Sequence, residues 1–332
     1  MKPRKVKIVG TGTYLPKQLI TSDDLDLKLQ VPPGWVLQKT DVRTRHFIQD
    51  ETAAEMGASA AYAALADAGL TIADIDCIVC TSGTMQQPIP CTAVLIQKAM
   101  LQEQSGIPCF DINSTCLSFV TGLDTMSYLI DAGRYRRVLL IATEIASEGI
   151  NWTDKESASL FGDGAAAVVI EQSTDSDHSA ILHAAMETYS SGAHLSEIRS
   201  GGSLQHAKQY TAANAANYLF QMNGQAIFRM ASKLLPRFVE QLLIKAQLRM
   251  ADISLVIPHQ GSALAMRLLR KRLDISEEKL LYTSPTFGNT IAASIPIGLH
   301  EAIRLGRVSR GDRILLLGTS AGLSLGGIVL EY

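Results

Sequence analysis

The residue whose position most favours chemistry is Cys116. The apolar residues up to Phe110 predict a strand end, and the run D-I-N-S-T at 111–115 favours a turn or a helix N-cap. Apolar residues spaced by three or four from Leu117 onward predict a helix. Cys116 is therefore expected in the first turn of that helix, where the positive end of the helix dipole favours the thiolate. The alternative is a buried cysteine that packs as a small apolar side chain.

Two further residues of reactive type occur in the second half of the chain. His259 comes directly after the apolar run L-V-I-P, where a strand is expected to end. Asn289 lies in F-G-N-T, before another helical pattern. Taken alone, the histidine could be a structural residue and the asparagine a helix N-cap. Together with Cys116 they supply a nucleophile, a neutral imidazole that can donate to an oxygen, and an amide donor.

An internal repeat gives these residues matching positions. The strand pattern R-V-L-L-I-A-T-E at Arg137 returns as R-I-L-L-L-G-T-S at Arg313, and we call the separation of these two arginines along the chain the repeat spacing. The same spacing separates Asn113, just before Cys116, from Asn289. Agreement in type, order and spacing over four elements favours two similar halves.

The repeat predicts an α/β fold with two similar halves, 1–172 and 173–332. Each half is expected to hold a mixed sheet buried between helices. A two-fold arrangement of the halves brings the helix starts at Cys116 and Asn289 towards one central point, with the strand end of His259 nearby. Loops at the carboxyl ends of strands are where α/β folds place their chemistry.

The composition indicates a globular protein with neither a nucleic-acid surface nor a membrane span. Apolar residues make up 47% of the 332 residues, and the formal net charge is −2. No apolar run reaches the roughly 18 residues that span a membrane, and the basic N-terminus has too short an apolar run for a signal peptide. The five cysteines argue against a disulfide framework, and Cys77 and Cys80 lack partners for a zinc site. We therefore expect a reduced, cytoplasmic protein.

Several motifs occur together here that are typical of one enzyme family. They are D-I-N-S-T-C ending at Cys116, I-P-H-Q at His259, F-G-N-T-I-A-A-S-I-P at Asn289, G-W-V-L-Q-K-T-D-V-R-T-R-H near Trp35, F-G-D-G-A-A-A at Phe161 and the glycine-rich ending G-T-S-A-G-L-S-L-G-G. In their order and spacing the chain resembles the thiolase-fold condensing enzymes, and within them the β-ketoacyl-ACP synthase III group (ACP, acyl carrier protein). The resemblance covers nearly the whole chain. It implies a thiolase-like fold of two pseudo-repeated halves in five layers, α-β-α-β-α.

The resemblance implies a condensation in two stages on Cys116. The thiol attacks the thioester of an acyl-CoA or acyl-ACP, and the backbone N–H groups of Cys116 and Ala321 hold the oxyanion. A malonyl thioester then loses carbon dioxide, while His259 and Asn289 stabilise the charge that develops on its thioester oxygen. The resulting carbanion attacks the acyl group. No metal or redox cofactor is implied, since CoA or phosphopantetheine acts only as the substrate carrier.

The resemblance also implies a substrate entrance lined with cations. Trp35, Lys39 and Arg43 stand where the family brackets the adenine and phosphates of CoA. Lys155 and Arg229 stand where they would meet an acidic carrier protein. The alternative for each is an ordinary solvated surface residue.

Two further expectations concern the acyl chain. Ile89 falls where the family places a side chain that crosses a homodimer interface and bounds the acyl pocket. The polar segment 190–222 is expected to cap the substrate region. The aliphatic Ile89, Phe287 in place of a histidine, and Thr319 in place of an aromatic depart from the best-known bacterial pattern. These changes allow a medium- or long-chain acyl donor, or a specialised pathway.

Two other functions stay open at this point. One is an enzyme that keeps the acyl-cysteine but transfers the acyl group to a non-malonyl acceptor, or joins two acyl chains head to head. The other is a non-catalytic partner subunit of a condensing heterodimer. The presence of Cys116, His259 and Asn289 argues against the second, because a structural subunit has no physical need for all three.

Overall fold

Two mixed β-sheets lie at the centre of the computed structural model, which describes residues 2–174 and 176–332. The first sheet has the strand order β1-β7-β6-β4-β5 and the second has the order β11-β12-β13-β8. The strands of the first sheet are β1 (Val6–Tyr14), β4 (Cys77–Cys80), β5 (Cys109–Asp111), β6 (Arg137–Glu144) and β7 (Gly164–Gln172). Those of the second are β8 (Ala180–Thr188), β11 (Leu255–Pro258), β12 (Arg313–Ser320) and β13 (Ser324–Glu331).

The two sheets repeat one topology when the first is followed from β1 and the second from β8. In both, the third and fourth strands pair in parallel, β6 with β4 and β12 with β11, and the strands before them pair antiparallel. Strands β6 and β12 have the same length and start at Arg137 and Arg313, as the repeat spacing predicts. The predicted repeat is therefore present in the fold. The division at 172/173 stays a prediction, although each sheet takes its strands from one side of it.

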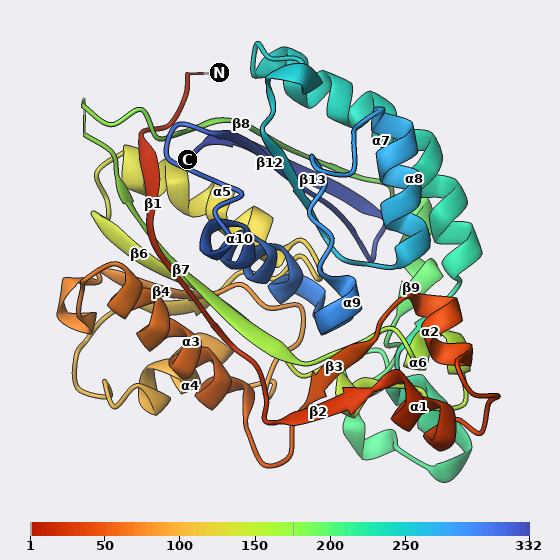
Figure 1. Ribbon diagram of the computed structural model, residues 1–332. Helices are drawn as coiled ribbons and strands as arrows, with labels where there is room; N and C mark the ends of the chain where they lie inside the picture. The colour runs from red at the N-terminus through yellow and green to blue at the C-terminus, as the bar shows by residue number, and fades with distance from the viewer. Residues whose placement is uncertain (1, 175) are drawn as a thin grey trace.

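Helices complete five layers (Figure 1). Helices α3 (Ala53–Asp67) and α4 (Thr92–Ala99) cover the outer face of the first sheet, and α7 (Gly224–Lys245) and α8 (Ala263–Leu273) cover the outer face of the second. Helices α5 (Ser118–Asp131) and α10 (Ser294–Arg304) lie between the sheets. Their apolar faces form one buried cluster with the facing strands. The predicted α-β-α-β-α arrangement is confirmed.

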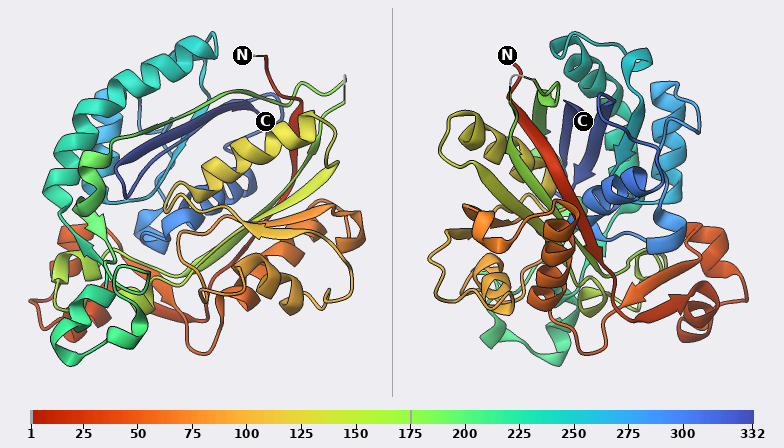
Figure 2. Two further views of the ribbon diagram at one scale, coloured as in Figure 1. Left: turned by 180° about the vertical axis from the view of Figure 1, so that it is seen from behind. Right: turned by 60° about the vertical axis from the view of Figure 1, so that its left-hand side comes forward.

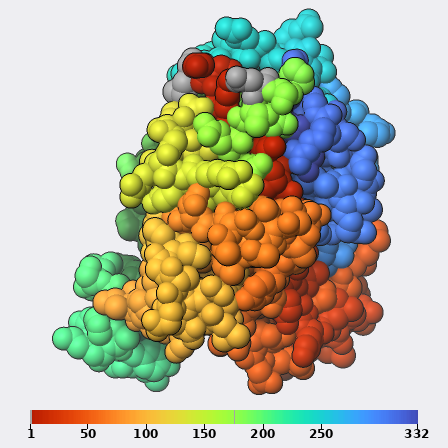
Figure 3. All heavy atoms as spheres, turned by 90° about the vertical axis from the view of Figure 1, so that its left-hand side faces the viewer, coloured from red at the N-terminus to blue at the C-terminus, as the bar shows by residue number. Residues whose placement is uncertain are grey.

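Smaller elements flank the layers at one end. They are β2 (Gln18–Thr21), α1 (Ser22–Lys28), α2 (Trp35–Thr40), β3 (Thr44–Phe47), α6 (Lys155–Ala158) and α9 (Ser284–Phe287), together with β9 (Ser196–Glu197) and β10 (Gln221–Met222). Strands β9 and β10 pair with each other within the segment 190–222. Part of this segment protrudes from the rest of the protein as a lobe (Figures 2 and 3). None of the helices in the described residues is both long and apolar enough to cross a bilayer.

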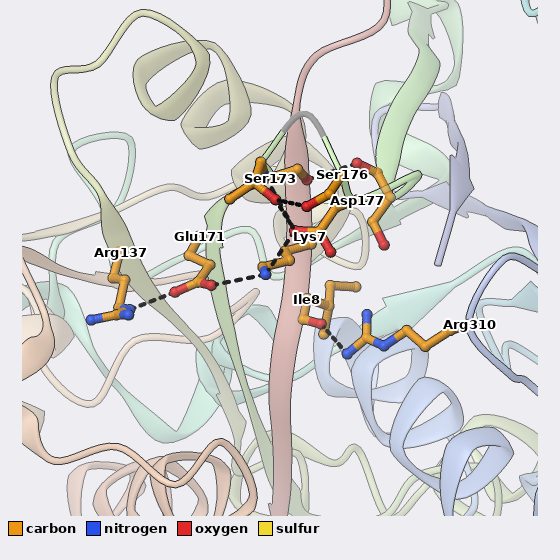
Figure 4. A network of polar contacts seen from close by, with 10 residues as sticks. Lys7, Ile8, Arg137, Glu171, Ser173, Ser176, Asp177 and Arg310 are labelled. Carbon is orange, nitrogen blue, oxygen red and sulfur yellow. Dashed lines mark hydrogen bonds and ion pairs between the residues drawn. The ribbon is translucent and has the colours of Figure 1, made fainter.

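Charged side chains tie the first sheet together at its far end (Figure 4). Glu171 on β7 lies 3.2 Å from Lys7 on β1 and 2.5 Å from Arg137 on β6, so one carboxylate joins three adjacent strands. Arg310, from the second half, donates to the main-chain oxygen of Ile8 at 2.7 Å. These contacts hold strand edges together at a distance from the strand ends that carry the reactive residues.

Helix α3 shows how the sequence sets the outer layer. Thr52 and Glu55 form a capping box at its start, which satisfies N–H groups that have no partner inside the helix. Its alanines allow the helix to approach β1 closely. A Cβ added at Gly12 of β1 would lie 2.3 Å from the main-chain nitrogen of Ala64 and 2.5 Å from the main-chain oxygen of Ala60. A glycine is therefore required at this helix–sheet contact.

The substitution Gly12→Ala tests this contact. Because both clashing atoms belong to a helix backbone, we expect the free energy of unfolding to fall by about 1–3 kcal/mol. Gly202→Ala is the matched control, since a Cβ there meets nothing within 4 Å, and we expect it to stay within about 0.5 kcal/mol of the parent. Equilibrium urea unfolding of both variants measures the difference. Equal stabilities would contradict the close packing of α3 on β1.

Candidate active site

Cys116 lies in a tight turn between β5 and α5. Helix α5 begins at Ser118, so the prediction that Cys116 sits inside the first helical turn is wrong. The reason is Thr115, whose φ of 52° is left-handed and cannot continue a helix. Two side chains hold this turn: Asn113 Oδ1 accepts the N–H of Thr115 at 2.8 Å, and Ser118 Oγ donates to the oxygen of Thr115 at 2.6 Å.

The same turn occurs in the second half, one repeat spacing further along the chain. Ile291 has a φ of 49°, its N–H donates to Asn289 Oδ1 at 2.9 Å, and Ser294 Oγ donates to its oxygen at 2.9 Å. A 3₁₀ helix (Ile291–Ala293) leads directly into α10, which begins at Ser294, so Asn289 lies two residues before the helical segment. The predicted correspondence of Asn113 and Asn289 is nevertheless confirmed to the residue.

One cavity of about 520 Å³ collects the three residues singled out by the sequence. Cys116, His259 and Asn289 all line it, as do Ser320, the last residue of β12, and Ala321 directly after it. The other walls come largely from apolar side chains, among them Leu160 and Phe161, Ile227, Phe228, Ala231 and Leu235 of α7, and Met266 and Leu269 of α8. The site is therefore a buried, mostly apolar chamber with few polar groups.

The environment of Cys116 does not favour the thiolate at rest. Burial, and after it the nearby carboxyl of Glu144, raise the pKa of the Cys116 thiol to about 12. The prediction of a dipole-stabilised thiolate is therefore wrong, because loss of hydration outweighs the helix end. The backbone N–H groups of Cys116 and Ala321 act on the sulfur and oppose this rise in the pKa. The structure thus brings together the two N–H donors that the sequence pointed to.

His259 and Asn289 present donors that are oriented by their neighbours. Burial lowers the pKa of His259 to about 4, so the ring is neutral at physiological pH. Its Nδ1 lies 2.7 Å from Ser294 Oγ. The single hydroxyl proton of Ser294 serves either this nitrogen or the oxygen of Ile291, and when it serves Nδ1 the proton of the ring is on Nε2. Because Asn289 Oδ1 already accepts from Ile291, the amide NH₂ group is the part left for a ligand.

Three residues of the site were missed by the sequence analysis. Ser294 orients His259, and carrying the repeat spacing forward from Ser118 would have found it. Gln260 is buried and links His259 to the neighbouring segment, donating to the oxygens of Pro258 and Leu281 at 3.0 and 3.1 Å. Glu144 ends β6 inside the protein. A single buried acidic residue at the end of a strand leaves no repeating pattern in the sequence, so periodicity could not identify Glu144.

Among the predicted substrate contacts, those near α2 and α6 lie together. Lys39 Nζ lies 5.8 Å from the centre of the Trp35 ring and 3.7 Å from Glu156 of α6. The neighbouring Lys155 donates to the main-chain oxygen of Gln30 at 3.4 Å. Trp35, Lys39 and Lys155 therefore form one cationic and aromatic cluster on the surface.

The other predicted contacts are scattered. Arg43, directly before β3, and Arg229, on α7, are both exposed. Among the described residues, no contact joins either of them to the cluster of Trp35, Lys39 and Lys155. Ile89 is 84% exposed in a loop. None of the six predicted contact residues is among the described residues that line the cavity. Their roles as substrate contacts stay predictions.

The segment 190–222 does lie over the cavity. Leu195, Ile198 and Met222 line it. The ring of Phe220 packs edge-on against Phe161 with centroids 5.1 Å apart, which holds the segment to the cavity wall. No group of three or more His, Cys, Asp or Glu side chains in residues 2–174 and 176–332 is arranged to bind a metal ion.

Comparison with known proteins agrees with the fold. The family model described as 3-oxoacyl-[acyl-carrier-protein] synthase III matches residues 110–190, and the model of its C-terminal part matches residues 243–332. A β-ketoacyl-[acyl-carrier-protein] synthase III from Aquifex aeolicus is 36% identical over 326 residues, which are 98% of this chain and 99% of the relative. The crystal structure of the Aquifex aeolicus 3-oxoacyl-[acyl-carrier-protein] synthase III has a TM-score of 0.88 at 35% identity, covering 98% of this chain and 100% of that chain. The priming β-ketosynthase of a polyketide biosynthetic pathway gives a TM-score of 0.88 at 26% identity, covering 99% and 97%.

The fold and these comparisons define an acyl-transferring condensing enzyme with a thiolase-like fold. The chain belongs to the β-ketoacyl-[acyl-carrier-protein] synthase III family. The family expected from the motifs is therefore confirmed.

The protonation state of His259 can be tested directly. We expect the ring to stay neutral from pH 8 to 5, with the proton on Nε2, because burial holds its pKa near 4. The unfolded chain binds this proton with a pKa of about 6.5, so acidification below that value favours unfolding through this group. Nitrogen-15 NMR of labelled histidines measures both the midpoint and the tautomer, and Ser294→Ala should shift the tautomer. A midpoint near 6.5 would contradict the assignment.

Proposed function

We propose that the protein catalyses the decarboxylative Claisen condensation of an acyl thioester with a malonyl thioester, in fatty acid or related acyl-chain biosynthesis in the cytoplasm. The observation that carries this proposal is one apolar cavity holding a cysteine, two backbone N–H donors and two side-chain donors. The halves 1–172 and 173–332 each supply one left-handed turn to the site, with Cys116 on the first and Asn289 on the second.

In the first half-reaction Cys116 displaces CoA from an acyl-CoA, or the carrier from an acyl-ACP. The sulfur–carbon bond to Cys116 forms, the bond to the leaving sulfur breaks, and the thiol proton of the enzyme leaves on the free carrier thiol. The N–H groups of Cys116 and Ala321 converge on the sulfur, and the same place suits the oxygen of the tetrahedral intermediate. Removing one such donor typically raises the barrier by about 3–4 kcal/mol.

In the second half-reaction a malonyl thioester enters the acylated site. His259 Nε2–H and the NH₂ group of Asn289 donate to its thioester oxygen as carbon dioxide leaves and enolate charge develops there. A neutral imidazole suits this role, because a positively charged ring would stabilise the malonyl carboxylate, which has to leave as carbon dioxide. The carbanion attacks the acyl carbonyl, releases Cys116 and gives a β-ketoacyl thioester. CoA and phosphopantetheine serve only as carriers, and the chemistry requires no metal or redox cofactor.

The surroundings of the cavity suggest where carriers and a second subunit meet it. We assign Trp35, Lys39 and Arg43 to CoA, and Lys155 and Arg229 to the carrier side, where an acidic ACP docks. The clustering of Trp35, Lys39 and Lys155 supports an anionic ligand at that edge. A homodimer is proposed because β5 ends its sheet and the loop beside it exposes apolar side chains. Ile89 of the partner subunit then bounds the acyl chain.

Two kinds of variant separate condensation from simple acyl transfer. Cys116→Ala should form no acyl adduct by intact mass, because the nucleophile is gone. His259→Ala and Asn289→Ala should still form the adduct but lose condensation by about 10²–10³-fold, since they remove donors to the developing enolate. Release of carbon dioxide from a malonyl thioester measures the second step.

Each outcome tests one of the candidate functions. An acyl adduct on folded Cys116→Ala would contradict the covalent mechanism. Full acyl transfer without malonyl-dependent carbon dioxide would favour an acyltransferase or a head-to-head condensing enzyme. A parent protein that acquires no adduct from any acyl-CoA would revive the non-catalytic partner subunit.

Ile89 provides a test of the dimer and the acyl pocket. Ile89→Phe should shift the preferred donor towards shorter acyl-CoAs, because the larger ring fills the end of the partner's pocket, whereas Ile89→Val should not. An excess of one methylene in a hydrophobic site typically costs about 1–3 kcal/mol, or 10–200-fold in kcat/KM. Acylation rates with acyl-CoAs from two to sixteen carbons measure the preference. An unchanged chain-length profile would contradict the assignment of Ile89.

A further inference from the structure

A fully buried carboxyl that the proposed mechanism does not use lies beside the site. Glu144 is the last residue of β6 and has no exposed surface. One of its oxygens accepts the N–H of Gly83 at 2.5 Å, and the other accepts the N–H and the hydroxyl of Thr84 at 3.0 and 2.6 Å. The N–H of Ala292 is also directed at this carboxyl. Four donors from two segments therefore converge on one side chain.

The segment that Glu144 holds separates the two left-handed turns. A Cβ added at Gly83 would lie 2.8 Å from Cγ2 of Ile291 and 3.1 Å from the carbonyl carbon of Thr115. Gly83 thus fits between the two residues of positive φ, with no room for a side chain. Its N–H donates to Glu144, and the N–H of Ala292, the next residue after Ile291, acts on the same carboxyl.

We propose that Glu144 is a positioning residue that clamps the turns of Cys116 and Asn289 at their working separation and, through its charge, sets the reactivity of the Cys116 thiol. The proposal rests on the proposed function only in taking Cys116 as the nucleophile. Glu144 acts through the Gly83–Thr84 segment and the N–H of Ala292.

The charge of Glu144 acts against the thiolate. The titratable neighbours that feel this carboxyl include the thiols of Cys116 and, on β4, Cys80, and it raises the pKa of both beyond the effect of burial. Burial raises the pKa of Glu144 itself to about 7, although the donors on Thr84 and Gly83 oppose the shift. The fraction of ionised Glu144 therefore changes around neutral pH, and the reactivity of Cys116 changes with it.

Glu144→Gln separates this role from simple structural support. The amide keeps the size of the side chain, removes the charge and turns one acceptor into a donor that faces an N–H group. Loss of the charge should lower the pKa of the Cys116 thiol by about one unit, which speeds alkylation by roughly 10-fold between pH 8 and 10. Loss of the clamp should slow condensation, by up to about 100-fold for a misplacement of 1 Å. The two rates should therefore move in opposite directions.

The experiment measures alkylation of the full-length protein by iodoacetamide from pH 6 to 10, with peptide mass spectrometry to follow Cys116 among the five cysteines. Thr84→Val is the matched control, because it removes one hydrogen bond to the carboxyl but keeps the charge. We expect its alkylation rate at pH 10, where Glu144 stays ionised, to equal that of the parent. Gly83→Ala keeps the charge and forces the turns apart, so it should slow condensation and leave the alkylation rate at pH 10 unchanged.

The parent protein supplies a measurement that needs no variant. Its alkylation profile should contain a second inflection near pH 7, from ionisation of Glu144. The proposal is overturned if Glu144→Gln is alkylated no faster than the parent between pH 8 and 10, if Thr84→Val speeds alkylation at pH 10 as much as Glu144→Gln, or if condensation is unchanged in Glu144→Gln. Alkylation uses no substrate, so these outcomes stand apart from a failure of the condensation itself.

Discussion

The structure of the site depends on two residues held with positive φ, Thr115 and Ile291. Such a backbone costs on the order of 1–3 kcal/mol at each residue and persists only where its surroundings fix it. Here the surroundings are an asparagine before each residue and a serine after it, in the same geometry. Without the turns, α5 and α10 would start earlier, and Cys116 and Asn289 would not face one cavity.

Loss of hydration is the second constraint, and it keeps the site neutral at rest. Burial raises the pKa of Cys116 to about 12 and lowers that of His259 to about 4, so neither carries charge near neutral pH. A helix dipole does not make Cys116 a thiolate at rest, because desolvation raises the pKa of the buried thiol by more than the dipole lowers it. During the proposed reaction, negative charge develops on oxygens that hydrogen-bond donors stabilise. The donors are the N–H groups of Cys116 and Ala321 for one oxygen and His259 and Asn289 for the other.

The sequence could predict the repeat, because it follows from spacing that both halves share, and the motifs that resemble one enzyme family implied the five layers and the three reactive residues. The repeat spacing pairs Asn289 with Asn113, and both residues hold the same turn in the fold. It could not predict where α5 begins, since apolar spacing cannot detect a positive φ at Thr115, a β-branched residue that rarely adopts one. It also could not predict Glu144, because the partners of this carboxyl are main-chain groups that only the fold assembles.

The halves share a backbone but divide the chemistry by side chain. Cys116 and Ala292 occupy the same place in the two turns, and Glu144 and Ser320 end the two matching strands. One half therefore carries the nucleophile and a buried carboxyl, while the other replaces both with small residues. Small residues leave room for His259 and for the Ala321 N–H to approach the sulfur. A site built from two copies of the first half would hold two nucleophiles and no equivalent of His259, so it is the difference in side chains on a repeated backbone that makes a condensation site possible.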